Sequence, residues 1–191
     1  MRLCLCLLGL FLAGGAVMLV TPAFGTTMIP LDLPAMSTRA EAVVAGRVEE
    51  THAAWTSDHE AIYTDVTIVV DRVLAGPLAV GQHVVVRREG GSVDGIAMKV
   101  YGAASFAKGE DVVVFLERRG ASRYVVGMAQ GKLALLTDAM GVRHLGRDLS
   151  EVAYTRPTNA AERAVGKIAT LDELAAEIAR INARTQKKPA Q

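Results

Sequence analysis

The chain has 191 residues, with 21 basic and 20 acidic side chains. This balance argues against nucleic acid as a partner, because binding to phosphates needs a basic excess. The only two cysteines are Cys4 and Cys6, so the rest of the chain has no thiol for a disulfide, a thiolate metal site or a nucleophile.

Residues 1–25 have the layout of a secretory signal peptide. Arg2 precedes the apolar run 3–20, and the small residues Ala23 and Gly25 form a cleavage site. We therefore predict an exported protein, periplasmic or secreted, that begins at Thr26 and keeps about 166 residues, a typical single-domain length. The apolar run is longer than in most signals, so an uncleaved membrane anchor is the alternative, and only then do we expect membrane contact.

The first predicted elements follow the signal. Thr38 and Glu41 have capping-box spacing, which favours a short helix or turn over residues 35–42. Residues 42–49 are apolar and predict a strand. Residues 51–60 are polar and predict a loop that contains Trp55, the only tryptophan.

Residues 62–74 predict a long strand, because its apolar residues alternate with polar ones. One face of it should carry Ile62, Thr64, Val66, Ile68 and Val70. Residues 82–88 predict a further strand with Val84 and Val86 on one face. A glycine turn at 89–92 and a weaker strand over 96–101 follow.

Residues 111–117 are the most apolar segment and predict a central strand buried on both faces. A hairpin at 119–122 leads into a strand over 123–127, and strands over 132–137 and 142–145 complete the β region. Short strands with glycine-marked turns predict a mainly β domain over residues 26–150. We expect an antiparallel β-barrel of OB type, with a two-sheet β-sandwich as the alternative.

The C-terminal part predicts a linker and a helix over residues 151–184, packed on the barrel. Thr170 and Glu173 have capping-box spacing at the start of this helix. Its apolar stripe consists of Leu171, Leu174, Ala175, Ile178 and Ile181. Residues 185–191 are polar and predict a disordered tail.

Trp55 is the candidate binding residue. It either anchors a partner or plugs the end of the barrel. His52, Asp58 and His59 share its predicted loop and are the only candidate metal ligands, although no established metal motif contains them and we predict no metal.

Other possible chemical groups match no established motif. Ser92 and Ser105 lie outside any Gly-x-Ser-x-Gly elbow, so neither has the signature of a nucleophile. The carboxylates of Asp94, Glu110 and Asp111 could meet only through the fold. Residues 127–132 differ from a phosphate loop in glycine spacing and in the residue after the lysine, so they predict a tight connection between strands.

These observations favour an exported, non-catalytic binding protein without a cofactor, whose partner is another exported or envelope protein. One alternative is an envelope hydrolase with a site assembled only in the fold, and another is a structural component of the envelope.

Residues 28–137 resemble a family of secreted bacterial proteins of unknown function. The matching blocks, in order, are 42–48, Trp55, 62–66, 73–76, 89–91, 106–110 and 112–116. More distantly, the order of helix, valine-rich strand, Tyr-Thr strand and Leu-x-Gly is similar to the netrin-like module. That module has an OB-type barrel and includes tissue inhibitors of metalloproteinases, whose fold and partner class the resemblance implies. The zinc contact of those inhibitors needs an N-terminal cysteine, which the chain lacks beyond Cys6.

Overall fold

The computed structural model describes residues 26–186. The predicted signal peptide and residues 187–191 of the predicted tail lie outside the described part. The helices are α1 (Leu33–Arg39), α2 (Ala160–Ala164) and α3 (Leu171–Gln186), with 3-10 turns η1 (Met128–Gly131) and η2 (Val165–Lys167). The strands are β1 (Thr26–Met28), β2 (Ala42–Trp55), β3 (Ile62–Ala75), β4 (His83–Glu89), β5 (Gly91–Val93), β6 (Ile96–Met98), β7 (Asp111–Arg119), β8 (Ser122–Val125), β9 (Lys132–Thr137), β10 (Arg143–Gly146) and β11 (Val152–Tyr154).

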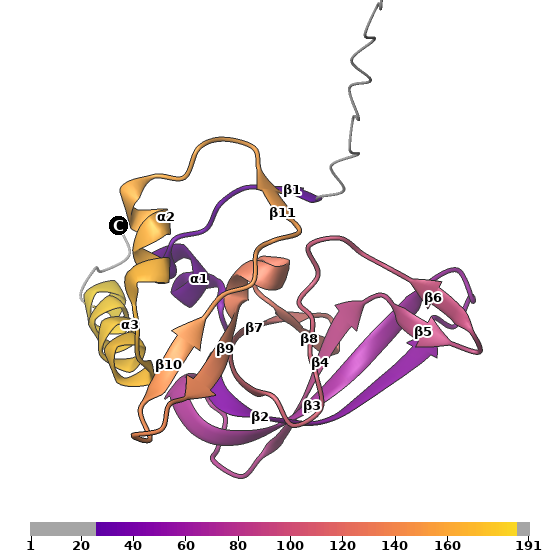
Figure 1. Ribbon diagram of the computed structural model, residues 1–191, viewed down its shortest axis with the longest axis horizontal. Coiled ribbons are helices and arrows are strands. Elements are labelled where there is room, and N and C mark those ends of the chain that lie inside the picture. Colours follow the sequence, from indigo (N-terminus) through magenta and orange to yellow (C-terminus); the bar gives the residue numbers. More distant parts are fainter. Residues whose placement is uncertain (1–25, 187–191) are drawn as a thin grey trace, which may run out of the picture.

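Five strands close into a ring, visible near the centre of Figure 1. Antiparallel pairs join β7 to β2, β2 to β3 and β3 to β4. The ring closes through β8, which pairs with β7 along four residues and touches β4 in parallel at Val86 and Arg123. The predicted mainly β class is therefore confirmed.

Four groups of elements surround this five-stranded ring. β9 and β10 extend the sheet outward from β7. β5 and β6 form a small hairpin at one end, and β1 pairs in parallel with β11 at another. The three helices gather on one side, with α3 beside α1 (Figure 1).

Two hydrophobic cores follow from the alternation of side chains along the strands. The ring core takes residues from all five ring strands, so it fills the ring: Val44, Val48, Val66, Ile68, Val70, Val84, Val86, Ala104, Val112, Val114, Leu116 and Val125. The helix core lies between the sheet and the helices: Leu33, Met36, Val43, Ala45, Val113, Phe115, Val126, Leu133, Leu135, Val165, Leu171, Leu174, Ile178 and Ile181.

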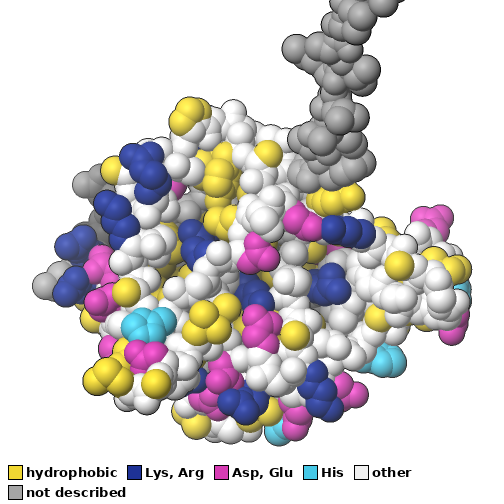
Figure 2. All heavy atoms as spheres, in the orientation of Figure 1, with side chains coloured by type: hydrophobic (Ala, Val, Ile, Leu, Met, Phe, Trp, Pro, Cys, Tyr) yellow, Lys and Arg dark blue, Asp and Glu magenta, His cyan; other side chains and the backbone are white. Residues whose placement is uncertain are grey.

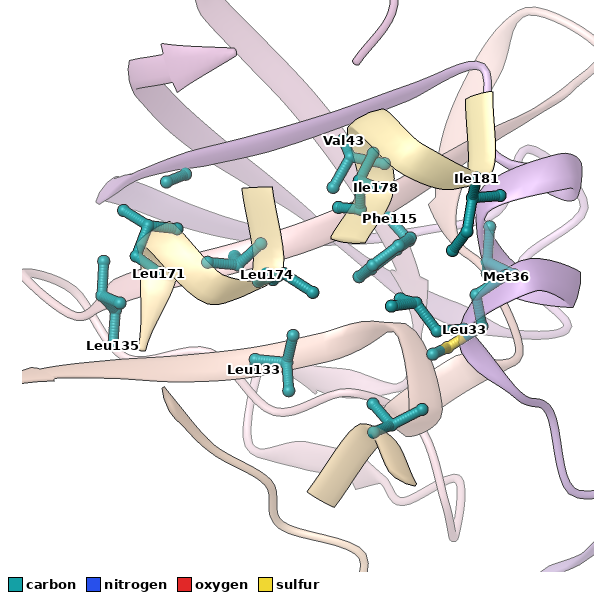
Figure 3. Packing of buried hydrophobic residues seen from close by; sticks show 14 residues of the cluster. Leu33, Met36, Val43, Phe115, Leu133, Leu135, Leu171, Leu174, Ile178 and Ile181 are labelled. Atoms are coloured by element: carbon teal, nitrogen blue, oxygen red, sulfur yellow. The ribbon is translucent and has the colours of Figure 1, made fainter. Parts of the chain in front are cut away.

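Figure 3 shows how the helix core is built. Leu171, Leu174, Ile178 and Ile181 project from α3 toward the sheet, where Phe115 lies. The predicted apolar stripe of this helix is confirmed, with Ala175 only half-buried. The predicted capping box is also present, because Thr170 Oγ1 accepts from Glu173 N at 3.3 Å and Glu173 Oε2 accepts from Thr170 N at 3.3 Å.

The strand predictions hold for β3, β4 and β7. The five residues expected on one face of β3 are all buried, as are Val84 and Val86. Residues 112–116 of β7 are buried on both faces because they serve one core on each side. The hairpin from β7 into β8 lies where it was expected, and so do β9 and β10 within a residue.

Three predictions about local structure were wrong. The helix α1 begins two residues earlier than expected, because Asp32 rather than Thr38 caps it by accepting from Ala35 N at 2.8 Å. Residues 51–55 are strand, because residues 62–66 of β3 offer them a pairing edge. Residues 160–164 form α2, which Asn159 and Glu162 cap reciprocally.

The end of the chain also differs from expectation. α3 continues to Gln186, two residues past the predicted end of the helix at residue 184. Within this last turn the Thr185 hydroxyl donates to Ile181 O at 3.1 Å.

Replacing Phe115 by alanine tests the packing of β7. The side chain is 0% exposed in the helix core, so Phe115→Ala should lower the free energy of unfolding by about 3–5 kcal/mol. The control Val85→Ala truncates a side chain that is 49% exposed on β4, and we expect it to stay within about 0.5 kcal/mol of the parent. Urea unfolding measures both, and a loss below about 1 kcal/mol for Phe115→Ala would contradict the burial of β7.

Candidate functional site

A cleft of about 620 Å³ lies beside the ring. Several segments that are distant in sequence line it. They are the end of β4 and the start of β5, the end of β6 and the segment up to residue 105, Glu110, parts of η1 and β9, and the segment from residue 148 to the start of β11.

A glycine turn joins β4 to β5 at the cleft wall. Gly90 has a φ of +85°, and a Cβ at this position would lie 2.7 Å from the Met98 carbonyl oxygen. The buried Thr64 Oγ1 donates to Gly90 O at 2.6 Å. Only glycine therefore lets the hairpin of β5 and β6 fold this closely against β3.

Two basic side chains of the cleft are paired with acids. Lys132 Nζ lies 2.5 Å from Glu110 Oε1, and the two side chains are only 12% and 24% exposed. Lys99 forms an ion pair with Glu151 at the more exposed edge. Glu110 and Glu151 are therefore both paired with a lysine. Such pairing compensates for the free energy that a charged group loses when it is partly removed from water.

Asp148 is the third acidic lining residue, and its carboxylate is hydrogen-bonded to a serine and not paired with a lysine. Its Oδ1 accepts from Ser150 Oγ at 2.7 Å and from Ser150 N at 3.0 Å. The Ser150 hydroxyl, followed by the Ser150 amide, holds the pKa of the Asp148 carboxyl below its ordinary value. Asp148 is therefore ionised at neutral pH and is not a proton donor there.

Arg88 is the third basic lining residue, and it forms no ion pair within residues 26–186. It follows Val84 and Val86 on the same face of β4, so its stem continues the row that fills the ring. The guanidinium Nη1 donates to Glu89 O at 3.3 Å. Burial lowers the pKa of Arg88 from its ordinary value, yet a guanidinium stays charged at neutral pH.

The two serines considered from the sequence, Ser92 and Ser105, both line the cleft, as does Glu110. None of the four histidines of the chain lines it, so neither serine has a histidine base there. The other two carboxylates considered lie elsewhere. Asp94 is in the turn between β5 and β6, and Asp111 binds Arg47 at 2.8 Å.

Trp55 lies outside the cleft, at the end of β2. It pairs with Ile62 of β3, its side chain is half-buried, and it belongs to neither core. Its ring centroid lies 6.1 Å from that of His59. The expected loop position is therefore wrong, and a tryptophan outside both cores does not plug the ring.

The three candidate metal ligands lie near Trp55 along the chain but do not converge. His52 is an exposed residue within β2, opposite Asp65. Asp58 serves the turn between β2 and β3, because it accepts from Thr56 Oγ1 at 2.5 Å and from Glu60 N at 3.1 Å. The structure holds no group of three or more His, Cys, Asp or Glu side chains placed to bind a metal in the part of the chain that it describes.

Gln130 has a structural role that the sequence does not indicate. The segment over residues 127–132 connects β8 to β9 through η1, as expected for a strand connection. Gln130 is 2% exposed, its Oε1 accepts from Leu31 N at 2.8 Å, and its Nε2 donates to Ile29 O at 3.1 Å. It therefore fixes the N-terminal segment beside the cleft.

Comparison of the chain with known protein families, with curated proteins and with solved structures finds no match in any of the three. Among the described residues, no helix combines the length and apolar character that crossing a membrane requires.

Truncation of Trp55 tests its position outside the cores. Because the side chain is half-buried, Trp55→Ala should lower the free energy of unfolding by about 1–2 kcal/mol, less than Phe115→Ala. Urea unfolding of both variants gives the comparison. An equal loss for the two would show that Trp55 carries as much packing as a core residue.

Proposed function

We propose that the protein is an exported, non-catalytic binding protein whose ligand enters the cleft. The proposal rests mainly on the cleft, which has a volume of about 620 Å³. Ligand sites of proteins occupy about 300–1,000 Å³ and combine apolar walls with a few polar groups. The lining is more polar than that of most such sites, because small apolar residues share it with three serines and with the charged residues Arg88, Lys99, Glu110, Lys132, Asp148 and Glu151.

The state of the charged groups favours binding over hydrolysis. A general acid needs a pKa raised toward neutrality, whereas the pKa of Asp148 is lowered by Ser150. Glu110 and Glu151 are bound to lysines, and no histidine lines the cleft beside Ser92 or Ser105. The alternative of an envelope hydrolase therefore has serines without a base, and a purely structural envelope component would have no need for the cleft.

The ring supports the proposed OB-type and netrin-like relationship. Its spatial order is β2, β3, β4, β8, β7 and back to β2, with a single parallel contact between β4 and β8. A five-stranded barrel of this kind, preceded by a short helix, is what the resemblance implies.

We also propose that the partner is another exported or envelope protein, with nucleic acid excluded. Basic and acidic side chains are intermingled on the face shown in Figure 2. A nucleic-acid site would instead need a continuous basic surface. Trp55 stays the candidate contact residue, because a half-buried tryptophan at the end of β2 can add apolar area to an interface.

Export requires processing after Gly25. The intact mass of the protein recovered from the exported fraction should correspond to a chain that begins at Thr26, which is also the first residue of β1. Recovery of a chain with intact Met1 in the membrane fraction would establish the anchored alternative.

Site-specific crosslinking tests whether ligand enters the cleft. In a background with Cys4→Ser and Cys6→Ser, the variant Ser105→Cys places one thiol on the exposed cleft lining. A benzophenone attached to this thiol should capture the ligand when the protein is irradiated in the exported fraction. Mass spectrometry then identifies the adduct, whether it is a small molecule or a protein.

Two matched variants carry the same label elsewhere. Ala121→Cys lies in the exposed turn between β7 and β8. His52→Cys lies on the Trp55 arm, which is the outer part of β2 and β3 where residues 51–55 pair with residues 62–66. We expect one defined adduct at Ser105→Cys and none at Ala121→Cys. Capture at His52→Cys alone would move the binding surface to the Trp55 arm, and identical adducts at all three positions would refute a specific site.

A further inference from the structure

We infer that the cleft binds a small organic acid, with the carboxylate of the ligand on Arg88 and its apolar part against the cleft wall. The inference rests on the proposed function, since it requires the cleft to be the ligand site. It adds the chemical class of the ligand and the side chain that selects it.

The charge balance of the cleft singles out Arg88. Within the described residues, the lining holds the basic side chains Arg88, Lys99 and Lys132. Both lysines are satisfied by glutamates of the same lining. Arg88 alone keeps most of its donors for a ligand, because its one hydrogen bond goes to a backbone oxygen at 3.3 Å.

The position of Arg88 makes the charge effective. Its stem lies on the inward face of β4, so the guanidinium is half-buried at the end of the ring instead of free in solvent. Charges in such places interact more strongly than at the surface, because water screens them less. Asp148 is the lining carboxylate that forms no ion pair; it is exposed and accepts from Ser150, and the charge of Lys132 acts on it as well.

The chemistry of arginine narrows the ligand to an oxyanion. A guanidinium presents a planar fork of donors that fits a carboxylate or a phosphate in a bidentate manner. Ser92 and Ser105 add hydroxyl donors to the same lining. An inorganic anion alone would leave most of the 620 Å³ empty, which favours an anion with an attached body.

Part of the lining is suited to an apolar body. Apart from the two lysine–glutamate pairs, Asp148 and the serines, the cleft offers Arg88 these aliphatic neighbours: Met98, Val100, Ala103, Ala129 and Ala134. Such side chains provide no hydrogen bonds to a sugar or a polar chain, and they gain free energy when apolar groups cover them. A carboxylate joined to a short aliphatic chain matches both parts of the cleft.

The test compares ligands that share one body and differ in the head group. Isothermal titration of the purified protein with hexanoate, hexan-1-ol and hexylammonium isolates the charge, and inorganic phosphate tests an oxyanion without a body. We expect hexanoate to bind at least about tenfold more tightly than hexan-1-ol, because hydrogen bonds between charged groups contribute more binding free energy than hydrogen bonds between neutral groups. Hexylammonium should not bind, and phosphate should bind more weakly than hexanoate.

Substitutions at Arg88 then locate the head group. Arg88→Gln should weaken hexanoate at least about tenfold and leave hexan-1-ol unchanged, and Arg88→Lys should lie between, because it keeps the charge but loses the fork. The control Arg87→Gln makes the same charge change on the other face of β4, where Arg87 pairs with Asp65 at 2.7 Å, and should keep hexanoate binding. Thermal melts confirm that each variant is folded.

Several outcomes would overturn the inference. Unchanged hexanoate affinity in a folded Arg88→Gln protein would remove Arg88 from the site, and phosphate binding as tight as hexanoate would remove the apolar body. Absence of binding by both hexanoate and hexan-1-ol would reject the organic acid. The benzophenone capture at Ser105→Cys would still decide the proposed function separately, because it assumes no ligand class.

Discussion

The structure depends on a single strand that is buried on both faces. β7 pairs with β2, β8 and β9, so three neighbours take its backbone hydrogen bonds. Its alternate side chains serve different cores, with Val112 and Val114 in the ring core and Val113 and Phe115 in the helix core. A strand in this position must be apolar throughout, which explains why residues 112–116 have no polar side chain.

The cleft depends on the same strand. Glu110 directly precedes β7, and Lys132 stands opposite Val114 in the pairing with β9, so β7 brings together the two charges of the partly buried ion pair. β8, which follows β7, closes the ring against β4 at Val86, two residues before Arg88. The position of the unpaired guanidinium is thus a consequence of how the ring closes.

Local patterns in the sequence predict the strands well where one face is buried. The alternation in residues 62–70 and the continuous apolar run in 112–116 both reflect burial, which is why the predictions for β3 and β7 are confirmed. The prediction for residues 51–55 failed because their strand structure comes from pairing with β3 in the partly exposed Trp55 arm. Polar residues are compatible with an exposed strand as well as with a loop, so the sequence pattern does not distinguish the two. Trp55 therefore lies in a strand that its polar neighbours do not indicate.

The cleft could not be predicted, because its lining combines segments as distant in sequence as Arg88 and Asp148. One signal was nevertheless present. Val84 and Val86 were expected on one face of a strand, and Arg88 is the next residue in that series. An arginine at the end of a buried row buries its stem and directs its head group either to water or to a ligand, so the alternation places Arg88 at the end of the ring and the structure is needed to show the cleft there.

Native-state hydrogen exchange tests most directly whether β7 unites the two cores into one unit. Amides of β7 within residues 112–116 and amides of α3 at Leu174 and Ile178 should exchange with one common free energy, equal to that of global unfolding. If the α3 amides exchanged at a free energy several kcal/mol below that of the β7 amides, the helix core would open independently of the ring. That result would contradict the account in which one strand holds both cores and the cleft beside them.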